Sequence, residues 1–213
     1  MPSCLIAQEF YSFGINQIFI LIANPYLTMT QEQYDKSIET GYLQLRLWDK
    51  VTHFSIVGFL FFIPVLFLVF HLVGYLRGNP AGFAGGELSI LIVPIFLGGL
   101  FYWLQKSRLK FKVLNTTLKH EEIVDLIKQL CKEWNWTPYL NNHNIFIAKT
   151  KPGALSGSWG EQVTILFNGN TILVNSICDP GEKQSLVSMG HNRENEQAIT
   201  DLVNNANRLY TKA

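Results

Sequence analysis

The sequence is poor in cysteine and in the short patterns that bind metals or nucleotides. Its three cysteines, Cys4, Cys131 and Cys178, lie far apart, with no CxxC pair and no clustered histidines to complete a zinc site. GxGxxG and P-loop spacings are also absent, so the sequence gives no support for nucleotide chemistry. We therefore expect free thiols in a reducing compartment, and neither a metal nor another cofactor.

Charged residues are scarce too, and they are unevenly placed. Asp, Glu, Lys and Arg make up 15% of the chain and leave a net charge of +1. This balance produces no global field that would attract nucleic acid, and no basic patch with interleaved aromatics occurs. Residues 54–104 contain only Arg77 and Glu87 as charged side chains. We expect no nucleic-acid partner, and the uncharged stretch indicates a membrane segment.

Two long apolar runs lie within residues 51–110. The run from His53 to Leu76 carries no formal charge and, at ~1.5 Å per residue, exceeds a hydrocarbon core of ~30 Å. The second run, from Leu88 to Leu104, is shorter and must extend back to Phe83 or stand nearly upright. A Gly- and Pro-rich turn joins them. The pattern predicts two transmembrane helices, about 54–76 and 83–104, that form a hairpin.

Basic side chains predict the orientation of this hairpin. Arg77 is the basic residue of the connecting loop, whereas several flank the outer ends of the two runs. They are Arg46, Lys50, Lys106, Arg108, Lys110 and Lys112. The positive-inside rule then places both termini in the cytoplasm, and Trp48, Tyr102 and Trp103 fit an aromatic belt at the same interface. We expect an integral membrane protein with the lipid bilayer as a partner.

Three residues inside the predicted spans are candidates for a functional role. Pro64 and Pro94 would each remove a backbone hydrogen bond and kink a helix, as a gating hinge requires. Proline is also common in membrane helices that simply pack together, and we favour packing. His71 is the ionisable group well inside either span, which indicates a proton or ion role. Alternatively, its ring reaches the interface or a neighbouring carbonyl.

The chain divides into three expected parts. Residues 1–50 form an N-terminal interfacial segment, because residues 5–27 are too polar for a confident span and too apolar for a solvated tail. Residues 51–110 form the transmembrane hairpin. Residues 111–213 form a cytoplasmic α+β domain, long enough to bury its own core.

An amphipathic helix is expected at the end of the N-terminal segment. Thr30 and Gln33 predict a capping box that starts it. Apolar residues then recur at helical spacing from Tyr34 to Trp48, although Gly41 weakens the continuity of the helix. The apolar face of this helix would meet lipid headgroups, the C-terminal domain or another copy of the chain.

The C-terminal domain combines helices with an antiparallel sheet. Helical spacing predicts a first helix from Lys119 to Trp134 and a closing helix whose core face runs from Ile199 to Leu209, with Asn192 as its cap. Between them, strands are predicted at 145–150, 161–167, 170–177 and 185–189. Asn168 and Gly169 are expected to form the two-residue hairpin loop. The order implies three to five strands with both helices on one face, a two-layer sandwich.

Short motifs in this domain carry a resemblance. SGSWGE at 156–161, NSICDP at 175–180 and SMGHN at 188–192 resemble the C-terminal domain of small uncharacterised bacterial membrane proteins with two transmembrane helices. The match covers mainly residues 111–210. It implies a bacterial inner-membrane setting and no known activity.

Two places in the domain are candidate ligand sites. The turn at 189–193 places His191, Asn192 and Arg193 beside a helix start, where free N–H groups bind anions, although the same turn is also an ordinary capped helix. The polar loop 151–160 contains Trp159, which either anchors a partner or folds back over one end of the sheet.

Catalytic chemistry has weak support in the sequence. Ser185, Ser188, Asp179 and His191 provide the residue types of a hydrolase, but no GxSxG pattern presents a nucleophile. His120, His143 and His191 lie in different expected elements and form no metal pattern. We assign no catalytic residue and no metal ligand.

Three functions stay open on the sequence alone. The first is a membrane-anchored module without catalytic activity that binds a protein partner or a small ligand. The second is an oligomeric membrane effector or pore, in which hairpins associate through Pro64, Pro94 and the small residues Gly98 and Gly99. The third is an enzyme at the membrane surface.

Overall fold

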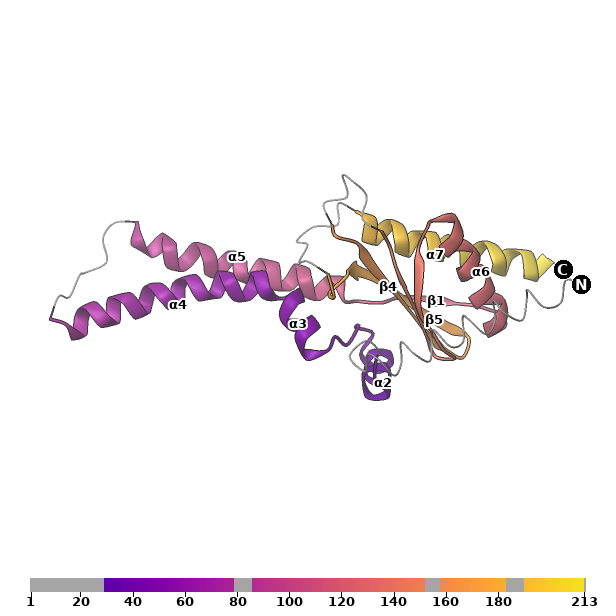
Figure 1. Ribbon diagram of the computed structural model, residues 1–213, viewed down its shortest axis with the longest axis horizontal. Coiled ribbons are helices and arrows are strands. Elements are labelled where there is room, and N and C mark those ends of the chain that lie inside the picture. Colours follow the sequence, from indigo (N-terminus) through magenta and orange to yellow (C-terminus); the bar gives the residue numbers. More distant parts are fainter. Residues whose placement is uncertain (1–28, 79–85, 152–157, 183–189, 213) are drawn as a thin grey trace, which may run out of the picture.

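The computed structural model describes residues 29–78, 86–151, 158–182 and 190–212. A helical hairpin projects from an α+β body (Figure 1), and the chain ends in a long helix on that body. The predicted interfacial segment at 5–27 and the predicted strand at 185–189 lie outside the described residues.

The body is built on a five-stranded sheet in which every neighbouring pair is antiparallel. The strands are β1 (Lys112–Asn115), β2 (Thr137–Asn141), β3 (Ile145–Lys149), β4 (Glu161–Asn168) and β5 (Thr171–Cys178). Their order is β1-β5-β4-β3-β2. The α+β class and the antiparallel sheet are therefore confirmed, whereas both edge strands are additions to the expected set.

The central hairpin turns one residue later than expected. Asn168 pairs with Thr171, so the two-residue loop consists of Gly169 and Asn170. Gly169 has φ 57°, while neither asparagine has a positive φ. Positive φ at the first loop position alone is typical of a type II′ turn, which favours glycine there. The expected Asn168–Gly169 loop was wrong because it assumed a turn with two positive φ angles.

Helices α6 (His120–Glu133) and α7 (His191–Lys212) cover one face of the sheet. Ile123, Ile127 and Leu130 of α6 pack with Ile199 and Val203 of α7 in one buried cluster with side chains of the sheet. The helical spacing of these apolar residues explains both helices, and both were expected. Two residues of the apolar spacings predicted for these helices are exposed instead of buried, Trp134 at 46% and Leu209 at 70%.

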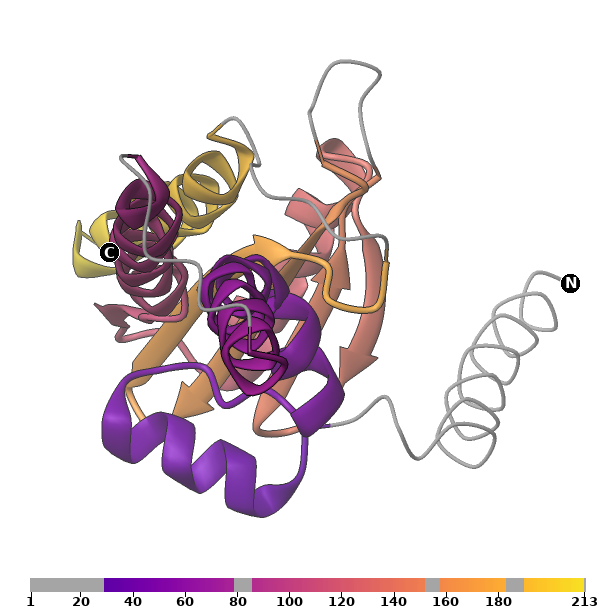
Figure 2. The same cartoon turned by 90° about the vertical axis from the view of Figure 1, so that its left-hand side faces the viewer.

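A third layer covers the opposite face, which the expected two-layer sandwich lacked. Helix α2 (Gln31–Thr40) lies there, on the other side of the sheet from α7 (Figure 2). Tyr34, Leu43 and Leu45 join a second buried cluster with Leu166 of β4, and the Tyr34 hydroxyl donates to the Phe167 carbonyl at 2.5 Å. Consecutive buried residues along the central strands are the physical reason, because a sheet covered on both faces needs apolar side chains on both.

The segment that follows α2 breaks the single helix expected from Tyr34 to Trp48. The Thr30–Gln33 capping box is present, as expected. Gly41, at φ 69°, ends α2, and the chain then runs extended to a separate helix α3 (Leu47–His53). Tyr42 forms a β-bridge with Lys110 instead of continuing the helix. Pairing between distant parts of the chain thus overrides a local helical spacing.

The two segments at the base of the hairpin pair with each other, and the second of them is also hydrogen-bonded to the sheet. Leu43 N–H donates to the Leu109 carbonyl at 2.8 Å, and Phe111 N–H donates to the Gly41 carbonyl at 2.9 Å. The buried Asn175 amide of β5 donates to the carbonyls of Arg108 and Lys110. The expected domain boundary at residue 111 therefore cuts through the second buried cluster.

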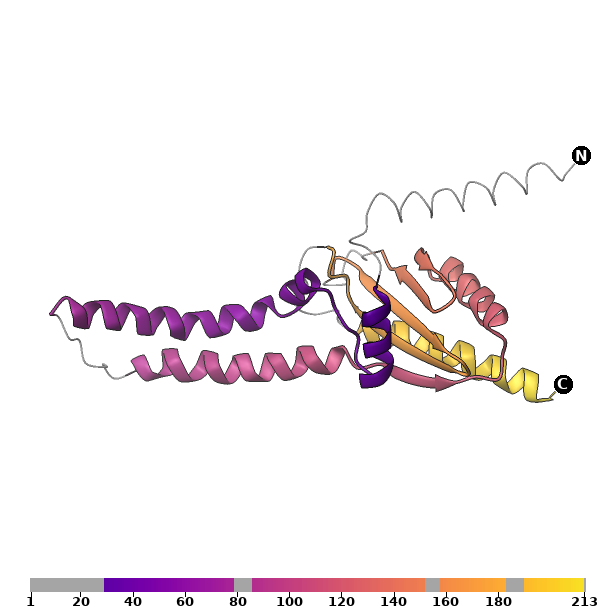
Figure 3. The same cartoon turned by 90° about the horizontal axis from the view of Figure 1, so that it is seen from below.

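The hairpin consists of α4 (Ser55–Leu76) and α5 (Glu87–Arg108), each of 22 residues. Both are long and apolar enough to cross a membrane. They lie side by side (Figure 3) and touch along a narrow inner stripe with seven-residue spacing. The stripe comprises Val57, Leu60, Pro64, Phe67, His71 and Gly74 of α4, and Leu91, Pro94, Gly98, Phe101 and Gln105 of α5. Most other apolar side chains of the two helices are exposed.

The three candidate residues of the predicted spans all lie on this inner stripe. Both helices continue through Pro64 and Pro94, and Pro64 is buried. The His71 Nε2 atom lies 3.7 Å from the Glu87 carboxylate at the start of α5, and its ring contacts Phe67. His71 thus faces an acidic side chain at the loop end of the hairpin.

We expect Leu43→Ala to lower the free energy of unfolding by about 2–5 kcal/mol, the usual cost of emptying a buried leucine site. Leu43 is 3% exposed and precedes the hairpin, so the loss would show that residues outside 111–213 complete the core. Leu209→Ala is the matched control and should change stability by less than about 0.5 kcal/mol. Denaturant unfolding of the full chain in micelles measures both, and equal values would contradict the three-layer packing.

Gly98 and Gly99 give a matched test of the hairpin interface. A Cβ at Gly98 would lie 3.1 Å from the Phe61 ring, whereas one at Gly99 would meet nothing within 4 Å. Gly98→Leu should therefore lower the thermal midpoint of the chain in micelles, and Gly99→Leu should leave it nearly unchanged. A hairpin that tolerated both substitutions equally would not pack as described.

Candidate functional site

The edge of the sheet nearest the hairpin gathers most of the buried ionic chemistry of the described residues. The end of β3, the start of β4 and the end of β5 meet there, because the three strands run antiparallel in sequence order. Helix α3 and the turn at 179–181 close the same edge. We call this region the hairpin-side edge.

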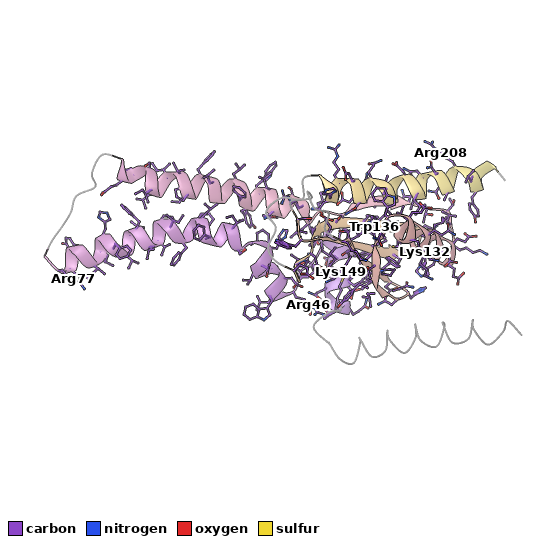
Figure 4. All side chains as sticks on the ribbon, turned by 45° about the horizontal axis from the view of Figure 1, so that its top comes forward. Arg46, Arg77, Lys132, Trp136, Lys149 and Arg208 are labelled. Atoms are coloured by element: carbon purple, nitrogen blue, oxygen red, sulfur yellow. The ribbon has the colours of Figure 1, made fainter. Side chains whose placement is uncertain are left out.

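A polar cavity of about 80 Å³ opens at the hairpin-side edge. Its charged lining comprises Arg46 and Asp49 beside α3, Lys149 of β3, and Asp179 of the turn. Tyr139 of β2 forms another wall. Figure 4 shows Arg46 and Lys149 near one another at the base of the hairpin, with Arg77 at its far end. The four formal charges of the lining cancel.

The best-defined interaction in the cavity is the ion pair between Lys149 and Asp179. Lys149 Nζ lies 2.6 Å from Asp179 Oδ2, and the Asp179 side chain is only 4% exposed. The other carboxylate oxygen accepts a hydrogen bond from Gly181 N–H at 2.9 Å. Lys149 Nζ also lies 4.9 Å from the centre of the Tyr139 ring, within reach of a cation–π interaction. Lys149 therefore contacts both walls of the cavity.

The Tyr139 hydroxyl is buried, and no hydrogen-bond partner for it exists among the described residues. Burial raises the pKa of this phenol, the Asp179 carboxylate raises it further, and Arg46 opposes the shift. A buried hydroxyl without a protein partner costs free energy unless water or another group in the cavity accepts its hydrogen bond.

Asp49 completes the electrostatic environment. Burial raises the pKa of its carboxyl group; Arg46 and Lys149 lower that pKa, and Asp179 raises it. The charges of Arg46, Lys149 and Asp179 all shift the pKa of Asp49. A ligand in the cavity would therefore meet hydrogen-bond donors and acceptors of both charges within one small space.

A smaller cavity of about 20 Å³ lies beside the first, between α3, α5 and β5. His53 Nε2 is 3.1 Å from the Gln105 carbonyl, and burial lowers the pKa of this histidine. Burial likewise raises the pKa of the Cys178 thiol, which disfavours the reactive thiolate. This arrangement suits structural packing better than nucleophilic catalysis.

Glu161, the first residue of β4, is buried at the same edge. Its carboxylate accepts hydrogen bonds from the hydroxyls of Thr150 and Ser158, and its N–H donates to Thr150 Oγ1 at 2.8 Å. These contacts join the two ends of the loop between β3 and β4. Both carboxylate oxygens of Glu161 are thus occupied in joining the edge, and the residue does not line the larger cavity.

The expected ligand residues of α7 do not converge. His191 Nδ1 lies 3.0 Å from Glu194, and Arg193 is exposed. Asn192 accepts a hydrogen bond from Ser176 at 3.3 Å and lies inside the helix, so the expectation that it caps the helix was wrong. The carbonyl of Gly190 accepts the first helical hydrogen bond, from Glu194 N–H.

Trp159 lies at the hairpin-side edge and is 53% exposed. Of the two alternatives, an exposed side chain therefore fits it better than a cover over the sheet. Within the described ranges, no group of three or more His, Cys, Asp or Glu residues could hold a metal ion. Ser185 and Ser188 of the weighed hydrolase set fall outside the described residues.

Comparison with known protein families and curated proteins assigns no function, so any assignment rests on the geometry of the site. No protein-family model matches this chain, and no relative was found among curated proteins. The resemblance of residues 111–210 to small bacterial membrane proteins therefore stays a prediction.

The cavity residues were largely missed at the level of sequence. The sequence indicated Asp179 only as one member of a possible hydrolase set. The sequence did contain a signal that Lys149 and Asp179 lie close together. In a sheet of antiparallel strands in sequence order, the first and third strands run in the same direction, so their C-terminal ends lie at the same edge. No comparable signal linked Arg46, Asp49 or Tyr139 to them.

We expect Asp179→Asn to lower the free energy of unfolding by about 1.5–3 kcal/mol, because it leaves the Lys149 ammonium without its partner. Lys149→Met combined with Asp179→Asn should cost less than the sum of the single changes. Asp125→Asn removes the exposed Lys128 partner at 3.4 Å and should cost less than about 1 kcal/mol. Denaturant titration measures all four variants, and additive losses would show that the buried pair is not coupled.

Proposed function

We propose that α4 and α5 cross a membrane and anchor a module that binds a small ligand without catalysing a reaction. Each helix is about 33 Å long at ~1.5 Å per residue, enough for a hydrocarbon core of ~30 Å. Phe70 and Phe96 are among many exposed apolar side chains on their outer faces, at 67% and 71%. Lipid is the environment in which that exposure costs least.

The orientation follows from the basic residues at the base of the hairpin. Lys50 and Lys106 lie beside the ends that join the sheet, and Arg77 lies at the opposite end (Figure 4). The positive-inside rule then favours a cytoplasmic module in a bacterial inner membrane.

The observation that carries the binding role is the unpartnered Tyr139 hydroxyl beside the neutral, four-charge cavity. A ligand of one charge would leave two of the four side chains opposed to it. A ligand that carries both a cation and an anion would complement them all. We therefore propose a small zwitterionic ligand that also accepts a hydrogen bond from Tyr139.

The two other functions have less support. An oligomeric effector would need small residues on the outside of the hairpin; Gly98 packs inward against Phe61, which leaves Gly99 alone of that pair on the outer face. A surface enzyme would need an activated nucleophile, yet burial raises the pKa values of the Cys131 and Cys178 thiols, that of Cys131 to about 11.

Tyr139→Phe should raise the free energy of unfolding by about 1 kcal/mol, because it removes a buried hydroxyl without a partner. Tyr34→Phe is the matched control and should lower it by a similar ~1 kcal/mol, because that hydroxyl donates to Phe167. Denaturant unfolding in micelles compares the two. If Tyr139→Phe is destabilising like Tyr34→Phe, the hydroxyl serves the fold and not a ligand.

The same variants test binding directly. Phosphoethanolamine and glycine should raise the thermal midpoint of the full chain in phosphatidylcholine nanodiscs more than inorganic phosphate or ethanolamine does. Tyr139→Phe should reduce that shift, and Tyr34→Phe should not. No shift with either zwitterion would reject the proposed binding role.

A further inference from the structure

The cavity lies close to the plane at which the hairpin enters the proposed membrane. Asp49 lies in α3, six residues before Ser55, the first residue of α4, so no more than about 9 Å of helical rise separates the two residues. A headgroup layer is roughly 5–8 Å deep on each side of the hydrocarbon core. In the proposed membrane, Asp49 would therefore lie near the inner boundary between headgroups and water, with Arg46 on the same side of α4.

Exposed apolar side chains lie near Asp49, at the same end of the hairpin. Leu47, Trp48 and Val51 of the short helix α3 are 74%, 76% and 52% exposed, although the helix adjoins the cavity. Trp103 of α5 is 64% exposed. Tryptophan with a polar neighbour is most stable at the interface between lipid and water, so α3 would lie among the headgroups.

The size of the cavity restricts what can enter it. About 80 Å³ accommodates several water molecules and hence a headgroup, but it does not accommodate an acyl chain. A lipid could place its headgroup in the cavity while its chains stay in the bilayer beside α4.

The charges of the cavity select among headgroups. Arg46 and Lys149 carry N–H donors that suit a phosphate, and the Tyr139 hydroxyl adds another donor. The Asp49 carboxylate suits an ammonium group, which must carry hydrogens to donate to it. A quaternary ammonium such as that of choline has no N–H, and a headgroup with a net negative charge would oppose Asp49 and Asp179.

We propose that the cavity binds the headgroup of an aminophospholipid from the surrounding bilayer, with phosphate at Arg46 and Lys149 and ammonium at Asp49. This inference rests on the proposed zwitterion-binding role of the same cavity and adds the source of the ligand. The occupancy of the cavity would then depend on the lipid composition of the leaflet next to the soluble module.

Native mass spectrometry of the full chain tests the inference. The chain is released from nanodiscs of equimolar phosphatidylethanolamine, phosphatidylcholine and phosphatidylglycerol, and its retained lipids are counted. Wild type should retain phosphatidylethanolamine over phosphatidylcholine by roughly tenfold, the value of one charge-assisted hydrogen bond. Asp49→Asn should remove that preference, and Arg46→Gln should reduce retention of both lipids.

Asp125→Asn is the control, because this exposed carboxylate belongs to a different surface and should leave the preference unchanged. Equal retention of the two zwitterionic lipids by wild type would overturn the inference, as would a preference that survives Asp49→Asn.

The soluble probes separate this inference from the binding role on which it rests. If phosphoethanolamine shifts the thermal midpoint in a Tyr139-dependent way while no lipid preference appears, the ligand is a free zwitterion and only the lipid source is wrong. If neither probe binds and no lipid is preferred, both proposals fail.

Discussion

The backbone pairing of residues 41–43 with residues 109–111 fixes the hairpin to the sheet. These segments enter and leave the hairpin, and Asn175 of β5 donates to the carbonyls of Arg108 and Lys110 on the side that leaves it. A hairpin that only anchored the body would need no more than one flexible connection to it. Here the two connecting segments are hydrogen-bonded to each other, and their apolar side chains are buried. The position of α3, and hence of the cavity beside it, depends on this joint.

The joint also supports the proposed ligand site at the hairpin-side edge. A ligand site on a rigid element is held at a defined depth relative to the spans, and the Lys149–Asp179 pair fixes the floor of the cavity. The internal charges are balanced, which offsets part of the desolvation cost of burying them near a membrane surface. In the proposed setting, a ligand bound in the cavity would lie directly beside the base of α4.

Elements governed by local pattern were predictable from the sequence. Run length located both apolar helices, the Thr30–Gln33 spacing located the start of α2, and helical spacing located α6. What failed depends on distant partners. Gly41 ends α2 because the chain must pair with residues 109–111, and β1 is a short edge strand with only Leu114 buried. The cavity joins six separate segments, so no single stretch of sequence could specify it.

Double electron–electron resonance on the full chain in nanodiscs tests the rigid joint most directly. Spin labels at Phe59 on α4 and Val113 on β1, both more than half exposed, would report the distance between hairpin and sheet. A joint hydrogen-bonded at both ends predicts one narrow distance distribution that is the same in every lipid composition. A broad or multiple distribution would show that the module swings on the hairpin, and would contradict a cavity held at the membrane surface.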